Sequence, residues 1–342
     1  MKAAFVTGPN TLEIREVPDP VPGDRDIVVK MRACGVCGSD TSYYVMGALP
    51  GYPAMPGGLP IGHEPTGVVS AVGKDVTGLA EGDAVFINPM AAPSGVIGNG
   101  GRLGALAEYL LVEGCEVGVS VKKIRDDIPF EVTALNEPMA VALHAVNRGE
   151  PLPTDKVVIF GAGPIGLGAL IWLKLRGVDH VVVADVQQDR LELAKRMGAD
   201  AVLDASGSPE EVTARLMEIH GAAANGIGLP RAGTDLYIDV AGAQASFDAI
   251  VASAKTRARV STAGVYKHAL SLDMSMALMA ELDLRWAMGY PTEIFDVTDQ
   301  LAEHWEQFAP MISHRIPFAD LQKGFDLLTT PSGAVKVSIL FD

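Results

Sequence analysis

The chain has 342 residues, 48% of them hydrophobic and 20% charged, and carries a net charge of −15 at pH 7. This length is enough for two domains with separate cores, and the acidic balance argues against nucleic acid or anionic membranes as partners. Three cysteines, Cys34, Cys37 and Cys115, cannot build a disulfide framework and fit a reducing compartment. Neither a secretory signal nor an apolar run of membrane-spanning length is visible, so we expect a cytoplasmic protein.

The first part of the chain has the pattern of a β-rich domain. Short β-branched runs predict strands at 6–17, 27–32, 67–72 and 83–88, separated by turns rich in Pro, Gly and Asp. This spacing favours a small barrel or sandwich over alternating strands and helices. Two glycine-rich stretches, 47–62 and 93–104, are predicted to be loops.

From about Thr154 the pattern changes to alternating strands and helices, which is typical of a doubly wound parallel sheet. The predicted strands are 157–160, 180–184, 198–203, 236–240 and 258–263, and the predicted helices are 165–176 and 189–197. A Gly/Ala-rich stretch, 220–233, is expected to be an extended loop without an assigned function. After residue 286 we expect helices near 297–308 and 318–328 and a final strand at 334–340.

A G-x-G-x-x-G motif follows the first strand of this second part and precedes an apolar helix. Gly161 permits a tight turn, Gly163 lets the backbone approach a pyrophosphate, and Gly166 lets the helix pack against the strand. The helix start at Pro164 and Ile165 offers unpaired N–H groups and a positive dipole end to phosphates. An ordinary strand–helix turn is the alternative, but the flanking elements favour a dinucleotide-binding motif.

The next strand ends in Asp185, where a carboxylate is expected to accept hydrogen bonds from the adenine ribose. A carboxylate there repels a 2′-phosphate, and no basic residue follows before Arg190. We therefore predict NAD rather than NADP, with Arg190 near the adenosine end.

A second group of chemically active residues lies before the dinucleotide motif: Cys37 in Gly-Val-Cys-Gly-Ser-Asp, His63 and Glu64 in Gly-His-Glu, and Glu137 in Asn-Glu-Pro. Taken singly, each is most often structural; a lone cysteine, for example, usually behaves as a small buried hydrophobe. Cys34 and Cys37 form a C-x-x-C pair, but a four-thiolate zinc site would need a second pair, which the chain lacks.

In this order, and followed by Gly-Ala-Gly-Pro-Ile-Gly, these motifs resemble the zinc-dependent medium-chain dehydrogenase/reductase superfamily, in particular its polyol, butanediol and threonine dehydrogenases. The resemblance covers nearly the whole chain and extends to residues 312–317. It implies a GroES-like catalytic domain of residues 1–150 and 287–342 and a Rossmann NAD-binding domain of residues 151–286. It also implies a homodimer or homotetramer that associates through sheet edges near 260–285.

The resemblance implies that Cys37 and His63 bind a catalytic zinc ion, for which thiolate and imidazole are suitable ligands. Glu137 matches the third-ligand position, and Glu64 matches a neighbouring carboxylate that binds the metal directly in some relatives. Asp40 matches an acid that orients the imidazole of His63. Which of the two glutamates binds zinc at rest is left open.

Ser39 resembles the first member of a proton relay, although an ordinary turn serine is an equal alternative. Many relatives continue this relay with a histidine five residues after the ligand cysteine, where this chain has Ser42. The route could then use water, Tyr43 or the nicotinamide ribose. Many relatives also bind a structural zinc with four cysteines, but the corresponding residues 88–104 include none. We expect one zinc ion per chain.

These features indicate an enzyme, a zinc-dependent oxidoreductase that transfers hydride between NAD(H) and a secondary alcohol, diol or polyol and its ketone. A zinc-free medium-chain reductase of the quinone or enoyl type is one alternative, although such enzymes lack the Cys and His ligand pair. A non-catalytic NAD-binding redox sensor is the other. The sequence selects neither the physiological small-molecule substrate nor the preferred direction of reaction.

Overall fold

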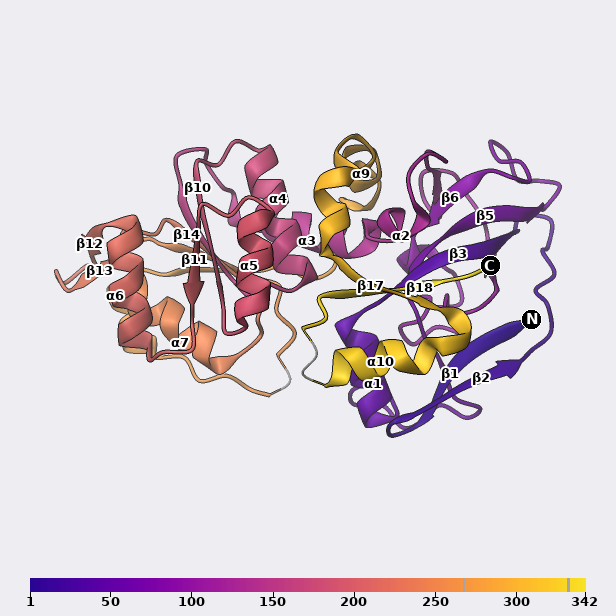
Figure 1. The fold of residues 1–342 in the computed structure, drawn as a ribbon, viewed down its shortest axis with the longest axis horizontal. Coiled ribbons are helices and arrows are strands. Elements are labelled where there is room, and N and C mark those ends of the chain that lie inside the picture. Colours follow the sequence, from indigo (N-terminus) through magenta and orange to yellow (C-terminus); the bar gives the residue numbers. More distant parts are fainter. Residues whose placement is uncertain (267, 331–332) are drawn as a thin grey trace. The chain divides into compact units, whose positions relative to one another are not determined.

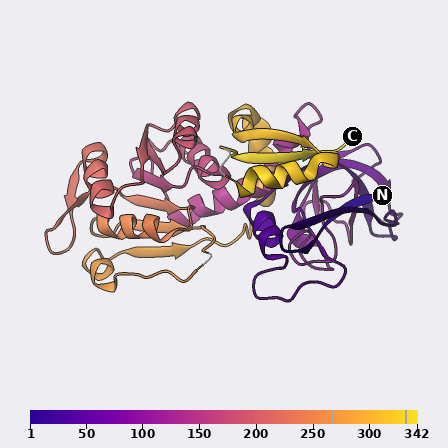
Figure 2. The ribbon, with the colours of Figure 1, turned by 60° about the horizontal axis from the view of Figure 1, so that its bottom comes forward.

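The computed structural model describes residues 1–266, 268–330 and 333–342. The chain divides into two units, Met1–Pro138 with Ile294–Asp342 and Met139–Glu293. Figures 1 and 2 show that the first unit contains both ends of the chain. The chain passes between units inside helix α3 (Asn136–Gly149) and again after Glu293, whereas the sequence pattern changes near 150 and 287.

The first unit is built on two sheets. Its strands are β1 (Lys2–Gly8), β2 (Thr11–Glu16), β3 (Ile27–Val36), β4 (Leu59–Pro60), β5 (Glu64–Val72), β6 (Ala84–Ile87), β7 (Tyr109–Val112), β8 (Val121–Lys123), β17 (Ile312–Pro317) and β18 (Lys336–Leu340). The larger sheet has the order β17-β18-β3-β5-β6-β8, with β7 also paired to β3, and the smaller has the order β2-β1-β4. The predicted β-rich character is confirmed, and the final strand pairs with β3 in antiparallel orientation.

Short helices complete this unit: α1 (Gly38–Met46), α2 (Phe130–Thr133), α9 (Ile294–Phe308), α10 (Leu321–Thr329) and the 3-10 turns Pro89–Ala91, Ala309–Met311 and Phe318–Asp320. The prediction of a single strand at 6–17 is wrong, because Asn10 has a positive φ of 54° and forms the turn between β1 and β2. Residues 93–104 contain no helix or strand, as predicted.

The second unit contains a six-stranded parallel sheet. Its strands are β9 (Lys156–Phe160), β10 (His180–Asp185), β11 (Ala201–Asp204), β14 (Leu236–Asp239), β15 (Arg259–Thr262) and β16 (Asp283–Trp286). The order β11-β10-β9-β14-β15-β16 confirms the predicted doubly wound sheet. The helices after α3 are α4 (Pro164–Leu175), α5 (Gln188–Arg196), α6 (Pro209–His220), α7 (Gln244–Ser253) and α8 (Met274–Met279).

The stretch predicted as an extended loop at 220–233 is instead a small hairpin. Strands β12 (Ala222–Ala224) and β13 (Pro230–Ala232) pair in antiparallel orientation. The carboxamide oxygen of Asn225 accepts hydrogen bonds from the backbone N–H groups of Ile227 and Leu229, which holds the turn. Within the described parts of the chain, no helix is long and apolar enough to cross a membrane.

Candidate active site

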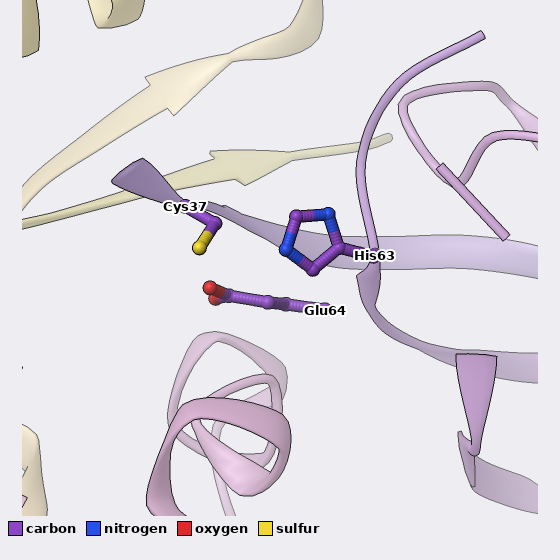
Figure 3. A group of neighbouring side chains, drawn as sticks. All are labelled: Cys37, His63 and Glu64. Carbon is purple, nitrogen blue, oxygen red and sulfur yellow. The ribbon is translucent and has the colours of Figure 1, made fainter. Parts of the chain in front are cut away.

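Three potential metal ligands meet at neighbouring strand ends of the first unit. Cys37 follows β3 at the start of α1, and Glu64 begins β5, directly after His63. Because Gly35 in β3 pairs with Glu64, the two segments lie side by side. The thiol, imidazole and carboxylate ligand atoms lie within 4.8 Å of one another and point toward a common space (Figure 3). Sulfur, nitrogen and oxygen donors in this arrangement suit Zn²⁺.

A buried carboxylate organises the cysteine and histidine segments. Asp40 Oδ2 accepts a hydrogen bond from the Cys37 N–H at 2.9 Å, and Oδ1 accepts one from the Gly62 N–H at 3.2 Å. His63 Nδ1 lies 3.4 Å from Asp40 Oδ1. Burial alone would lower the pKa of His63, but Asp40 and Cys37 raise this pKa well above its ordinary value. These surroundings therefore favour positive charge, which a metal cation also supplies.

Glu64 is fully buried and faces a lysine from the last strand. Lys336 Nζ donates hydrogen bonds to Glu64 Oε1 at 2.5 Å and to the Val36 carbonyl at 3.1 Å. Burial lowers the pKa of Lys336, but the negative charge of Glu64 outweighs this effect and the pKa is raised. A Cβ on Gly35 would lie 1.8 Å from Glu64 Oε2, so a larger residue at this position would displace the Glu64 carboxylate. The Glu64 carboxylate is thus held between a counter-ion and the other two potential ligands.

Glu137 lies in the first turn of α3 with its side chain buried. Its negative charge helps to raise the pKa of Lys336, so it acts within electrostatic range of the cluster. It is not among the three side chains whose ligand atoms gather within 4.8 Å in the described residues. The structure therefore brings together three of the four predicted ligands, and a role for Glu137 remains a prediction.

Polar side chains extend from the cluster along α1. Ser39 Oγ lies 3.2 Å from His63 Nε2, whereas Ser42 donates its hydrogen bond to the Gly38 carbonyl of its own helix. Burial raises the pKa of Tyr43, and the nearby Ser39 hydroxyl opposes this rise. Ser39 therefore acts on the hydroxyl of Tyr43, whereas Ser42 is engaged with the backbone of its own helix.

Two contributors, Asn99 and Lys336, were not singled out in the sequence. Tyr43 donates a hydrogen bond of 2.5 Å to Asn99 Oδ1, in the cysteine-free loop 93–104. The signal for Lys336 was a lysine at the start of an otherwise uncharged strand, but its partner could not be identified without the strand order.

The loop 93–104 packs on the histidine segment through its backbone. Gly98 has a φ of 65°, and a Cβ there would lie 2.0 Å from the Gly62 carbonyl oxygen. The Gly98 N–H donates to the Leu103 carbonyl at 2.7 Å, and the Ala105 N–H donates to the Gly62 carbonyl at 2.9 Å. Close packing and hydrogen bonds hold this loop beside His63 without cysteine ligands.

The glycine motif of the second unit has the space that a dinucleotide requires. Gly161 has a φ of 105°, and a Cβ on Gly166 would lie 1.8 Å from the Gly161 carbonyl oxygen. Side chains at these two positions would therefore disrupt the turn. Pro164 and Ile165 are the first residues of α4, so the helix N-terminus follows the turn directly. This geometry fits a pyrophosphate bound at the helix N-terminus.

Asp185 ends β10 and is buried beside the glycine turn. Its Oδ2 accepts a hydrogen bond from the Ala162 N–H at 2.6 Å, and its Oδ1 accepts one from the Gln187 N–H at 2.9 Å. A carboxylate has about four acceptor positions, so capacity remains for a ribose hydroxyl. A Cβ on Gly163 would meet only Arg190, whose Nη1 would be 4.0 Å away. The surface of the turn is therefore open and has a guanidinium beside it.

Comparison with protein families gives two matches along the chain. The family described as "Alcohol dehydrogenase GroES-like domain" matches residues 23–120, and "Zinc-binding dehydrogenase" matches residues 164–304. The first range includes Cys37, His63 and Glu64, and the second begins at the start of α4.

Individual relatives match over nearly the full chain. Human sorbitol dehydrogenase is 29% identical over 339 residues, which cover 94% of this chain and 90% of the relative. The crystal structure of 2R,3R-butanediol dehydrogenase from Bacillus subtilis has the same fold, with a TM-score of 0.84, 24% identity and 99% coverage of both chains. A zinc-binding dehydrogenase from Sinorhizobium meliloti, crystallised with NADP, has a TM-score of 0.81 and 26% identity and covers 99% of this chain and 98% of its own.

Proposed function

Because the chain belongs to the zinc-dependent medium-chain dehydrogenase family, we propose that it transfers hydride between NAD(H) and a secondary alcohol, diol or polyol and its ketone. The observation that supports this proposal most strongly is the convergence of Cys37, His63 and Glu64 on one space. Two of its relatives are named as dehydrogenases of a polyol, sorbitol, and of a diol, butanediol, which supports the same substrate class for this chain.

Cys37 and His63 would hold the zinc ion, with Glu64 or Glu137 as the further protein ligand. Zinc at this place supplies Lewis-acid polarisation of a substrate oxygen, which makes loss of a hydroxyl proton and departure of hydride easier. Asp40 binds the backbone N–H of Cys37 and faces His63 Nδ1 at 3.4 Å, so one carboxylate lies beside both ligand residues.

Ser39 is positioned to hold the proton that leaves the substrate hydroxyl. Asn99 Oδ1 can only accept a hydrogen bond, so the Tyr43 hydroxyl donates to it and keeps its own oxygen available to accept from Ser39. Ser42 is engaged with its helix backbone. The Tyr43 proton is directed at an amide oxygen that does not pass it on, so Tyr43 would orient Ser39, and the proton would leave Ser39 through water or the nicotinamide ribose.

The cofactor preference follows from Asp185, whose negative charge disfavours a 2′-phosphate. A relative crystallised with NADP shows that the wider family also accommodates the phosphorylated cofactor. Arg190 lies beside Gly163 at the glycine turn, which supports the predicted place of this residue near the adenosine end of the cofactor. We propose NAD as the cofactor of this chain.

Assembly as a homodimer or homotetramer and a cytoplasmic location complete the proposal. β16 lies at the edge of the parallel sheet, within the region that was expected to associate. All three cysteines are free, which suits a reducing compartment. Light scattering coupled to size-exclusion chromatography measures the assembly, and a monomer would contradict that part of the proposal.

The test combines metal analysis with cofactor reduction. Purified protein is assayed for zinc and for NAD reduction with sorbitol, 2,3-butanediol and simple secondary alcohols, beside Cys37→Ser, His63→Ala and the control Cys115→Ser. We expect zinc and activity to be lost together in the first two variants and retained in the control. Activity without zinc would instead support a zinc-free reductase, and NAD binding without turnover would support a redox sensor.

A further inference from the structure

A buried aspartate at the end of β14 joins two loops of the second unit. Asp239 Oδ1 accepts hydrogen bonds from the Ala241 N–H at 3.2 Å and from the Ser246 hydroxyl at 3.1 Å. Its Oδ2 accepts a hydrogen bond of 2.5 Å from the hydroxyl of Tyr266. Since Tyr266 lies in the loop after β15, this bond connects residues 263–266 to the end of the neighbouring strand.

The backbones of the loops that follow β14 and β15 are in close contact near this bond. Gly242 has a φ of 64°, and a Cβ there would lie 2.7 Å from the Val265 carbonyl oxygen. A Cβ on Gly264 would lie 2.7 Å from the Gly242 nitrogen. The ring of Tyr266 packs edge to face on Trp286 of β16, with centroids 6.5 Å apart. The N–H groups of Ala263 and Gly264 also donate to the Asp239 carbonyl, at 3.0 and 3.1 Å, and fix the start of the loop. Its end at Tyr266 is held by the ring contact and by the hydroxyl, which also contacts the Thr262 hydroxyl.

The two loops lie where the second half of a dinucleotide is expected. The chain crosses from β11 back to β14, which pairs with β9, so the topological switch point lies between β9 and β14. Ligands of such sheets bind at the carboxyl ends of the strands at this point. The glycine turn and Asp185 follow β9 and β10 and would take the adenosine half. The loops after β14 and β15 remain for the nicotinamide half, and a Cβ on Gly161 would lie 3.0 Å from the Ala241 nitrogen.

From this arrangement we infer that the Tyr266–Asp239 hydrogen bond is a latch that holds backbone 263–266 in place to receive the nicotinamide half of the cofactor. The inference rests on the proposed binding of NAD by this unit. Tyr266 is then a positioning residue, which acts through the loop and does not itself take part in the reaction.

The protonation states support a permanent latch. Burial raises the pKa of Tyr266, and the charge of Asp239 raises it further. Burial also raises the pKa of Asp239, although the hydroxyls of Tyr266 and Ser246 oppose this rise. The Tyr266 hydroxyl therefore keeps its proton and remains the donor.

The test compares two ligands that differ only at the latched end. NADH contains the nicotinamide, whereas ADP-ribose contains the adenosine half and both phosphates without it. We expect Tyr266→Phe to weaken NADH binding about tenfold, the range expected for one hydrogen bond to a charged group, with the affinity for ADP-ribose unchanged. Fluorescence titration measures NADH, and calorimetry measures ADP-ribose, so neither readout requires turnover.

The matched control is Tyr237→Phe. Tyr237 is a fully buried tyrosine of β14, whereas Tyr266 is half-buried, and the Tyr237 hydroxyl accepts a hydrogen bond of 3.0 Å from Ser253 in α7. This control removes a comparable buried hydroxyl away from the two loops, and we expect both affinities to remain unchanged. Asp239→Asn, which alters the other side of the latch, is expected to reproduce the selective loss of NADH affinity.

The two ligands separate failure of the latch from failure of the proposed cofactor. If the unaltered protein binds both ligands and Tyr266→Phe affects both equally or neither, the latch is refuted while the dinucleotide site stands. If the unaltered protein binds neither ligand, the proposed cofactor is refuted and the latch with it. Melting temperatures of the two tyrosine variants show whether a general loss of stability explains weaker binding.

Discussion

Among individual residues, Lys336 and Glu64 connect the stability of the first unit most directly to its chemistry. Both side chains are buried, and the pair joins the last strand to the segment that carries His63. A buried pair of this kind contributes little beyond a well-packed apolar pair, but removing one partner leaves an uncompensated charge. The pair therefore makes Glu64 dependent on either Lys336 or a metal cation.

We expect Lys336→Met to lower the free energy of unfolding of the metal-free protein by about 3–5 kcal/mol, because it leaves the buried Glu64 carboxylate without a counter-charge. Urea unfolding in the presence of a chelator measures this loss, and added zinc should recover part of it. The control is Lys123→Met, which removes a surface ion pair of 2.7 Å with Asp83 and should cost at most about 1 kcal/mol. Equal losses in the two variants would contradict the proposed dependence.

Asp185→Gly is expected to move cofactor preference toward the phosphorylated form by about tenfold or more, because it removes the charge that repels a 2′-phosphate. The ratio of dissociation constants for NADPH and NADH measures the shift. Asp204→Gly is a matched control, since Asp204 pairs with Asp185 in the sheet but lies exposed at the end of β11. An unchanged ratio in Asp185→Gly would argue against the assigned role.

The residues that could be predicted are those that lie in local motifs. Cys37, His63 and the three glycines were identified because their neighbours in the sequence have specific spacing. Lys336 could not be identified in this way, because it lies 272 positions from Glu64 and meets it only when β18 pairs with β3. The Tyr266–Asp239 bond depends in the same way on the parallel pairing of β14 and β15.

Among the helices, α6 ends at a buried histidine. His220 Nδ1 lies 2.8 Å from Thr234 Oγ1, and its Nε2 lies 3.1 Å from His180 Nδ1. Burial lowers the pKa of His220 to about 4, with further lowering from the charges of His180 and Lys156. The helix end and the hairpin that follows it are therefore built around a neutral imidazole.

This geometry predicts a loss of stability in mild acid. An unfolded histidine has a pKa of about 6.5, so below that pH the unfolded chain binds a proton that folded His220 does not. Stability should fall as the pH decreases from about 6.5 toward about 4, the folded value. His220→Gln should remove the part of the acid-induced loss of stability that comes from this histidine. The control His314→Gln, in the edge strand β17, should leave that loss unchanged. Melting temperatures at pH 7 and pH 5 measure the difference.

Strands and helices with strong periodicity were predicted well, and short or mixed elements were not. The strand at 157–160 and the helix after it were recovered nearly to the residue, because a β-branched run and an apolar helix flank glycines. The hairpin of β12 and β13 was missed, since its strands of three residues are mostly alanine and lack β-branched side chains. Its turn depends on Asn225, whose side-chain oxygen binds backbone N–H groups no more than four residues away.

For the molecule as a whole, the resemblance implied domains of residues 1–150 with 287–342 and of residues 151–286, whereas the compact units are Met1–Pro138 with Ile294–Asp342 and Met139–Glu293. The sequence pattern could not locate the point inside α3 at which the chain passes from the first unit to the second, because a continuous helix gives no break in periodicity at Pro138. Proline within the first turn of a helix is tolerated and does not mark a boundary.

At this scale the protein is expected to bind one zinc ion per chain. The loop 93–104 has no cysteine and is held by backbone hydrogen bonds, so it does not require a structural metal. Elemental analysis of dialysed protein should give about one zinc per chain, falling to near zero in Cys37→Ser. A value near two in the unaltered protein would show a second site that these residues do not explain.

The pairing of β18 with β3 also sets an order of events during synthesis. Residues 139–293, which form the second unit, are translated before the strand that carries Lys336. Until that strand leaves the ribosome, residues 33–36 of β3 lack their β18 partner and Glu64 lacks its lysine. The nucleotide-binding unit can therefore fold on the nascent chain, whereas Glu64 gains its lysine only in the finished polypeptide. A zinc ion bound before that point would take the place of Lys336 as the counter-charge of the Glu64 carboxylate.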